Sequence, residues 1–333
     1  MFRHTPLRYT VLALLAAGAL FQAITAGYFG LEVLIEILIL AMLVLALDMV
    51  AGFGGMVSLC HGALMGVGAY AFATSAGVLG LTPVVSLVGA IALTGAIAWV
   101  IGAVCARSHG IYFIMATLAF GQMAYSYIFQ TPFFGGDDGM GGIERLDLSA
   151  FGIDLTDSRS FALFCLAVLG LVYLACVGIL RSGLGRSLTG VMHSEQRMRA
   201  LGLTVWRVKA DVFGLSGMIA GLAGALSAMN VMYISPGLLD WTVSGEALVV
   251  VILGGLGTLV GPMIGAVALV VLKHELSAVT PYWHLVVGLL LIGVVMSRAN
   301  GIFGWIEAQI GARFDKRLND VTRPTTTEEP RDA

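Results

Sequence analysis

Five polar side chains fall within or beside long apolar stretches of this sequence, where their chemistry suits contact with a polar solute. They are Ser58, His61, Thr117, Gln122 and Glu246. An unpaired charge at membrane depth costs about 2.5 to 3.5 kcal/mol, so polar groups there serve hydrogen bonding, ion pairing or a solute pathway. Ser58 precedes His61 by three residues and shares its helical face. A pathway is therefore one hypothesis for these residues, and a packing role for His61 is the other.

Further acidic residues fall in or beside the same stretches. Asp48 lies within one of them, whereas Glu32, Glu36 and Asp240 are expected near a membrane interface. Glu246 directly precedes an unbroken apolar run and is the strongest candidate for a gate or a structural ion pair. In a protein that transports alone, Asp48 and Glu246 would be proton or ion sites.

The sequence lacks the common catalytic patterns. Lysine occurs only at positions 209, 273 and 316 and never follows glycine, so there is no phosphate-binding loop of the G-x-x-x-x-G-K-[ST] type. A G-x-S-x-G nucleophile elbow is also absent. We therefore expect no enzyme and no cofactor in this chain, and any ATP must be hydrolysed by another subunit.

The sequence also predicts no metal site. Its four cysteines, which lie in apolar surroundings without a C-x-x-C pair, are expected to be small buried packing residues. The six histidines are scattered without zinc-binding spacing.

A basic segment, residues 182–210, interrupts the apolar chain with Arg186, Arg197, Arg199, Arg207 and Lys209 around a single Glu195. Ser194 is a suitable N-cap and Gly202 a suitable left-handed stop, which together predict a short helix. Met198 and Leu201 can share its apolar face, and Ala200 is small. The helix lies either on anionic lipid or in the groove of another protein.

Three segments repeat glycine at the spacing that lets membrane helices approach closely. Gly62 and Gly66 form the first pair, and Gly217 and Gly221 form the second. The third segment contains Gly257, Gly261 and Gly265, with Pro262 interrupting it. Such segments predict close helix packing, or a broken helix that lines a cavity.

Composition places the chain in a membrane. Of its 333 residues, 58% are hydrophobic and only 11% are charged, against about a quarter charged in soluble domains. The 44 glycines agree with close packing of membrane helices. The net charge of −2 gives no sign of a nucleic-acid partner.

The chain divides into apolar stretches of about 17 to 25 residues, long enough to cross a bilayer. They are 9–28, 31–51, 62–80, 83–105, 111–131, 160–180, 211–233 and 283–303. The first follows a basic start that resembles a secretory signal, but an uncleaved span is favoured because further spans follow at once. Region 243–275 is too long for one span and short for two.

Basic residues near span ends mark the cytoplasmic side. Arg3, Arg107, segment 182–210 and Arg313 are therefore expected there, whereas the acidic loop 132–159, with Asp137 and Asp138, is expected outside. Parity then requires 243–275 to supply an even number of crossings, as two short helices or a re-entrant element. We expect an all-α protein of about ten membrane helices with both termini cytoplasmic, in which Lys273 is an exception on the outer side.

The predicted domain organisation is a membrane domain over 1–312, followed by a polar tail over 313–333. Threonine, proline and glutamate dominate the end of that tail, which favours disorder.

Four segments resemble, in order, the membrane permeases of bacterial branched-chain amino acid ABC transporters, of the LivM type. They are SLCHGALMGVGAYAFA (58–73), GIYFIMATLAFGQMAYSYIFQTPFFGGDDGMGGI (110–143), SEQRMRALG (194–202) and VSGEALVVVILGGLGTLVGPMIGA (243–266). The matches span about residues 45 to 266, which is most of the apolar chain.

This resemblance implies an importer subunit in the bacterial inner membrane, in contact with lipid. Its partners would be a second, LivH-like permease, ATPase subunits and a periplasmic solute-binding protein. Segment 194–202 would be the coupling motif that docks into the ATPase, with Glu195, Ala200 and Gly202 at the matching positions. Asp137 and Asp138 would face the binding protein.

The chain departs from the family pattern at several positions. Arg197, Met198 and Arg199 stand where relatives often carry Ala and Glu, which implies an acidic groove on the ATPase. Asp48, Met56 and Cys60 stand where Asn, Gln and Gly are common. The resemblance implies branched-chain amino acids as the solutes, whereas these departures favour keeping urea, amides or aromatic acids as alternatives within the family.

Overall fold

The computed structural model describes residues 6–146 and 155–279 together with eight further positions between 282 and 304. The described helices are α1 Pro6–Thr25, α2 Tyr28–Gly54, α3 His61–Ala73, α4 Pro83–Cys105, α5 Ile111–Gln130, α6 Ser158–Arg181, α7 Gly183–His193, α8 Glu195–Ala200, α9 Val205–Val231, α10 Trp241–Gly254 and α11 Val260–Val279. Single turns occur at Thr74–Val78, Pro132–Phe134, Gly136–Asp138 and Pro236–Leu239, and strands β1 Met140–Gly141 and β2 Tyr233–Ile234 form one short antiparallel ribbon.

Six of the described helices are long and apolar enough to cross a membrane, and the shorter apolar segments Tyr9–Thr25 and Trp241–Gly254 accompany them. The predicted helical, multi-pass architecture is therefore confirmed in this part of the chain. The predicted stretches 83–105 and 111–131 agree with α4 and α5 to within one residue. The tail 313–333 and most of the stretch 283–303 lie outside the described residues.

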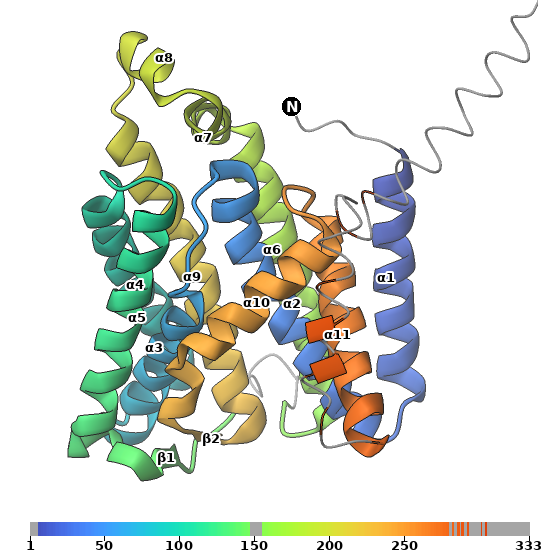
Figure 1. Cartoon of the computed structure of the whole chain (residues 1–333). Helices are drawn as coiled ribbons and strands as arrows, with labels where there is room; N and C mark the ends of the chain where they lie inside the picture. Colours follow the sequence, from blue (N-terminus) through green and yellow to red (C-terminus); the bar gives the residue numbers. More distant parts are fainter. Residues whose placement is uncertain are drawn as a thin grey trace, which may run out of the picture.

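Helices α2 and α9 form the centre of the bundle. Apart from Glu32, Glu36 and Asp48, helix α2 is apolar on all its faces, which is the pattern of a helix buried on all sides. Helix α9 packs against α2, α3 and α4. Helix α1 lies on one flank and α4 and α5 on the opposite flank (Figure 1). The outer helices α4, α5 and α6 leave much of their apolar surface exposed, as lipid contact allows.

Glycines on α9 allow its close contact with neighbouring helices. A Cβ atom added at Gly221 would meet the side chain of Thr94 on α4, and one added at Gly217 would meet Ala98. A Cβ at Gly224 would run into the backbone of Met65 on α3. Because lipid removes the hydrophobic drive for helix association, such close backbone packing supplies much of the attraction.

We expect Gly224→Leu to lower the free energy of unfolding by about 3 kcal/mol, because its neighbour is backbone that cannot move aside cheaply. Thermal unfolding of the detergent-solubilised protein measures the change. Gly178→Leu is the matched control, since Gly178 lies inside α6 with nothing near its Cβ position. Equal melting temperatures for the two variants would contradict this packing.

The third predicted stretch, 62–80, forms α3 and the single turn Thr74–Val78, and a non-helical segment separates it from α2. Helix α2 ends at Gly54, where Gly55 adopts a left-handed φ of 65° and caps it. The chain then continues as non-helical backbone over residues 55–60 until α3 begins at His61, and Ser58 and Cys60 in this non-helical segment are buried. The sequence shows no sign of this arrangement beyond clustered glycines, because Met56, Val57 and Leu59 are as apolar as their surroundings.

Region 243–275 resolves into two helices, the first of the two alternatives predicted. Helix α10 has 14 residues and α11 has 20, and residues 255–259 separate them. The break contains Gly255 and Gly257 with positive φ, and Leu259 with a φ of 59°. Gly261 packs against the backbone of Gly254, which keeps the two helices close together.

The two ends of the bundle differ in structure. Helices α7 and α8 stand at one end, and strands β1 and β2 at the opposite end (Figure 1). We refer to these as the α8 end and the ribbon end.

Candidate functional site

Ser58 and His61 belong to a buried hydrogen-bonded chain that joins three elements. His61 Nδ1 lies 3.1 Å from Ser58 Oγ, and His61 Nε2 lies 2.8 Å from Ser216 Oγ on α9. The Ser216 hydroxyl donates to the Ala46 carbonyl of α2 at 2.6 Å. His61 therefore ties α3 to α9 and, through Ser216, to α2.

The direction of these bonds fixes the histidine tautomer. Since the single proton of the Ser216 hydroxyl goes to Ala46, His61 must donate to Ser216 from Nε2. In the neutral imidazole, Nδ1 is then the acceptor, and the Ser58 hydroxyl donates a hydrogen bond to it. Both ring nitrogens are thus engaged within the protein. The geometry favours the packing role over solute contact for His61.

Thr117 lies on α5 and supports the non-helical segment between α2 and α3. Its hydroxyl accepts the backbone N–H of Leu59 at 3.2 Å. Ser58 Oγ accepts the N–H of Cys60 at 3.3 Å, and Ser244 Oγ on α10 accepts the N–H of Gly62 at 2.8 Å. Non-helical backbone at membrane depth needs such partners because no water is available there. These hydroxyls make the break between α2 and α3 possible.

Asp48 holds the second break, between α10 and α11. It is 0% exposed, and its two carboxylate oxygens accept the N–H groups of Gly257 at 2.6 Å and Leu259 at 3.0 Å. These donors directly precede α11, whose N-terminus carries a partial positive charge that favours an anion. The contact at Gly52, where a Cβ would meet the Gly257 backbone, brings α2 close enough for this cap.

Gln122 and Glu246 occupy a different kind of position. Both are partly exposed, on α5 and α10, and neither forms a hydrogen bond or ion pair within the described residues. Gln122 lies on one face with Ser126 and Gln130, and Gln130 Nε2 donates to Ser126 Oγ at 2.8 Å. The five predicted pathway residues therefore separate into three that support buried backbone or helix contacts and two that face outward.

The face of α5 that carries Gln122 is an unusual surface for lipid contact. Helix α5 is the least apolar of the six candidate spans, and only 22% of its apolar 18-residue stretch is buried. Polar residues within membrane segments generally face a protein interior or water rather than lipid. A second subunit or an aqueous pathway accounts for this face better than acyl chains do.

Lys273, the predicted exception to the charge rule, is neutralised by α2. Its Nζ lies 3.1 Å from Glu36 Oε1, and His274 Nε2 lies 2.9 Å from Glu36 Oε2. Glu32, one turn earlier, accepts a hydrogen bond from Asn230 Nδ2 at 3.0 Å. The acidic residues of α2 thus fasten α11 and α9 near the ribbon end.

The acidic loop is pinned to the bundle at the ribbon end. Arg145 donates to the carbonyls of Leu155 at 3.2 Å and Met229 at 3.3 Å, and its guanidinium lies 4.6 Å from the centre of the Phe161 ring. Tyr233 Oη donates to the Asp138 carbonyl at 2.5 Å. The carboxylates of Asp137 and Asp138 remain exposed on this surface.

The segment 182–210 folds as two short helices followed by the start of α9. The Ser194 hydroxyl caps α8 by accepting the N–H of Arg197 at 3.4 Å, and Gly202 ends it with a φ of 82°. Both predicted helix boundaries are confirmed. Met198 contacts Gly190 of α7, whereas Leu201 is 76% exposed, so the two do not share one buried face as predicted.

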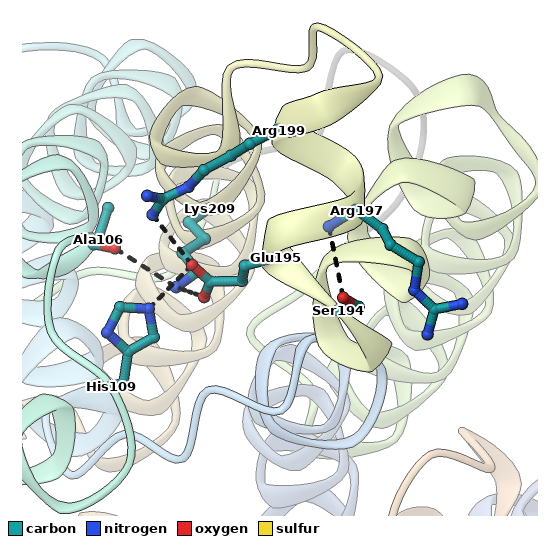
Figure 2. Close-up of polar contacts among 7 residues, drawn as sticks. All are labelled: Ala106, His109, Ser194, Glu195, Arg197, Arg199 and Lys209. Atoms are coloured by element: carbon teal, nitrogen blue, oxygen red, sulfur yellow. Dashed lines mark hydrogen bonds and ion pairs between the residues drawn. The ribbon is translucent and has the colours of Figure 1, made fainter.

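Glu195 is the centre of an ionic cluster at the α8 end (Figure 2). Its carboxylate pairs with Lys209 of α9, with His109 Nε2 at 2.8 Å and with Arg199 Nη2 at 3.3 Å. Burial raises the pKa of Glu195, but hydrogen bonds and charge from Lys209 and His109 outweigh this effect and lower it below its ordinary value of 4.5. The Glu195 carboxylate is therefore ionised above that pH and becomes protonated only in stronger acid.

Sequence reasoning missed several partners of the predicted residues. Ser216, Ser244 and His109 were not singled out, although each completes a contact described above. Serines on apolar helices are too common to signal such a role. The glycines at 62, 66, 257, 261 and 265 all lie against neighbouring backbone or side chains within the bundle. No group of three or more His, Cys, Asp or Glu in the described residues could hold a metal ion.

A family model described as a branched-chain amino acid transport system permease component matches residues 29–295. Two curated relatives are LivM proteins, high-affinity branched-chain amino acid transport system permeases, from Salmonella typhimurium strain LT2 and Escherichia coli strain K12. Each is 28% identical, over 293 and 288 residues respectively, covering 80% of this chain and 68% of the relative. No solved structure matches the chain significantly. The chain therefore belongs to the branched-chain amino acid permease family as a multi-pass membrane protein.

Proposed function

We propose that this chain is one of two permease subunits of an ATP-driven importer in the bacterial inner membrane. Its partners are a LivH-like permease, ATPase subunits that bind and hydrolyse ATP, and a periplasmic solute-binding protein. Branched-chain amino acids are the proposed solutes, because the descriptions of the matching family and of the LivM relatives name them. The α8 end faces the cytoplasm, where the basic segment belongs by the charge rule, and both termini are cytoplasmic.

The observation that carries this proposal is the form of the α8 end. Helix α8 is capped at both ends and presents Leu201 to solvent beside the exposed Arg197. A large apolar side chain next to a cation suits a pocket with an acidic rim on a partner protein better than free solution. We assign this surface, Arg197 with Ala200, Leu201 and Gly202, to docking of the ATPase subunit.

The solute pathway lies between the two permeases. Gln122, on the polar face of α5, and Glu246, on α10, supply its polar groups in this chain. Ser58, His61 and Thr117 do not contact the solute. They support the pathway indirectly by fixing the break between α2 and α3. Asp137 and Asp138 at the ribbon end contact the binding protein, whose own pocket supplies most of the specificity.

We expect Gln122→Cys and Glu246→Cys to react with a charged, membrane-impermeant thiol reagent in the assembled complex. The thiolate is the form that reacts, and a thiol facing an aqueous pathway can ionise to it, whereas a thiol facing lipid cannot. Leu171→Cys on α6 is the control, since Leu171 is 67% exposed but faces lipid on this account. The four native cysteines are buried and give a low background. Equal labelling at all three positions, or labelling at 171 alone, contradicts this pathway.

The solute itself is tested with the purified complex. Leucine, isoleucine and valine, each presented with the cognate binding protein, are expected to stimulate ATP hydrolysis. Stimulation by urea, an amide or an aromatic acid and not by leucine would move the assignment within the family. Met56 and Cys60 are buried within the non-helical segment, so their departure from the family pattern can change the interior shape.

An ion-coupled transporter that works alone is the second candidate, favoured by one observation. Glu246 is a carboxylate near membrane depth without an ion pair among the described residues. Vesicles containing only this chain would then accumulate solute with an imposed ion gradient. We expect no accumulation in them without the ATPase subunits and ATP.

A further inference from the structure

Glu195 occupies the motif position expected to meet the ATPase, yet its carboxylate is directed into this chain. Its Oε1 accepts a hydrogen bond from Lys209 Nζ of α9. Its Oε2 accepts hydrogen bonds from His109 Nε2 and Arg199 Nη2. Lys209 is 4% exposed and also donates to the Ala106 carbonyl at 3.3 Å. Ala106 and His109 both belong to the connection between α4 and α5. One carboxylate thus connects α8 with two separate parts of the membrane bundle.

The docking surface and this cluster lie on different sides of α8. In Figure 2, Glu195 and Arg199 point toward Lys209 and His109, whereas Arg197 points to the other side of the helix. Arg197 and Leu201 are exposed, and the Leu201 side chain is 76% exposed. A partner bound to the exposed side would therefore meet Arg197 and Leu201, while Glu195 remains covered.

We propose that Glu195 is a positioning residue that ties α8 to α9 and to the α4–α5 connection, and does not contact the ATPase subunit. The inference rests on the proposed function, because it concerns how movement of a docked ATPase reaches the membrane helices. Helix α8 has only six residues and is joined to its neighbours by short connections. The ion pair with buried Lys209 makes α8 move together with α9, and α9 contacts α2, α3 and α4.

We call the Glu195–Lys209 ion pair the tether. Because Lys209 is buried, the tether is a stiff connection between α8 and α9. Lys209 is removed from water and fixed between a carboxylate and a carbonyl, so the pair is not an exchanging surface salt bridge. Arg199 and His109 are largely exposed and add less, because surface ion pairs contribute little. We therefore expect Glu195 and Lys209 to act as one unit in coupling.

The test uses the complete complex reconstituted in vesicles, with the binding protein and leucine, and measures both ATPase retention and solute taken up per ATP hydrolysed. We expect Glu195→Gln to keep the ATPase bound and to lower uptake per ATP by about 10-fold, a typical size for coupling between sites. Lys209→Met should lower the same ratio, and Lys209→Arg should preserve it. The double variant Glu195→Gln/Lys209→Met should be no worse than Glu195→Gln, because both changes remove one interaction.

Arg197→Gln is the matched control on the other side of the same helix. It is expected to weaken ATPase retention and to leave uptake per ATP by the bound fraction unchanged. Release of the ATPase by Glu195→Gln but not by Lys209→Met would show that Glu195 contacts the ATPase, and would overturn the inference. Additive losses in the double variant would overturn it as well.

Failure of the proposed function gives a different pattern. In that event Leu201→Asp leaves ATPase retention unchanged, or wild-type uptake does not depend on ATP. With Leu201→Asp releasing the ATPase, the results for Glu195 and Lys209 judge the tether alone. Membrane levels of each variant, measured in the same vesicles, exclude misfolding as the cause.

Discussion

Gly202→Trp is expected to abolish ATP-driven uptake and to release the ATPase subunit while the protein stays in the membrane. Gly202 ends α8 at a φ of 82° with nothing within 4 Å of its Cβ position, so the bundle itself has room for a side chain. The indole would project from the docking surface beside Leu201. Blocking the centre of an interface costs about 2 kcal/mol of binding free energy or more, which is a loss of affinity above about 30-fold. Co-purification of the ATPase measures this loss.

Two controls separate the bulk of the indole from backbone strain. Gly202→Ala places a Cβ at the same positive φ without the bulk, and should retain most of the ATPase. Gly80→Trp carries the same bulk at a φ of 65°, also with nothing within 4 Å, in the connection before α4. It should retain the ATPase as the wild type does. Retention of the ATPase by Gly202→Trp would show that docking occurs elsewhere.

Asp48→Leu is expected to lower the free energy of unfolding by about 2 to 6 kcal/mol. It leaves the N–H groups of Gly257 and Leu259 buried without an acceptor, at about 1 to 3 kcal/mol each. The similar size of leucine adds no cavity. Asp48→Asn keeps one oxygen as an acceptor, so we expect about half of the loss. Thermal unfolding of the solubilised protein measures both variants.

The same variants discriminate a structural cap from an ion site. On our account Asp48→Asn remains active in ATP-driven uptake, since one acceptor still holds the break between α10 and α11. A stable Asp48→Asn protein without transport would instead assign the carboxylate to ion or proton movement. Ser86→Ala is the control, because the buried Ser86 hydroxyl has no hydrogen-bond partner among the described residues and its removal should cost nothing.

Much of the fold follows from local signals in the sequence. Pro83 begins α4 and Gly202 ends α8, at the residues that their conformational preferences predict. Parity of the charged segments also gave two short helices as one of two alternatives for 243–275, and two helices are present there. Helix starts and stops depend on neighbouring residues, and parity depends on the order of charged and apolar segments, so a single sequence reveals both.

The non-helical segment before His61 could not be predicted in the same way. Its stability depends on Thr117 and Ser244, which lie far along the chain and look like ordinary residues of apolar helices. The sequence placed Ser58, His61 and Thr117 correctly among apolar residues, but residue type alone does not tell a solute contact from a backbone partner. That distinction requires the tertiary contacts, which separate these three from Gln122 and Glu246.

The direction of Glu195 was also beyond sequence reasoning. A glutamate in a basic, solvent-exposed helix is expected at the surface, and the motif suggested contact with another protein. Its direction is decided by Lys209, which α9 buries beneath the connection between α4 and α5. The same helix therefore divides its residues between an external and an internal role.

The central claim is that force from the ATPase enters this protein through α8. Thiol cross-linking from Leu201→Cys tests it most directly, because the native cysteines are buried and Leu201 is the most exposed apolar side chain of that helix end. In vesicles of the complete complex, cysteine at 201 is predicted to cross-link to the ATPase subunit, with a yield that changes when ATP is added. Tyr233→Cys at the ribbon end should not cross-link to the ATPase. A cross-link from 233 and none from 201 would contradict the account.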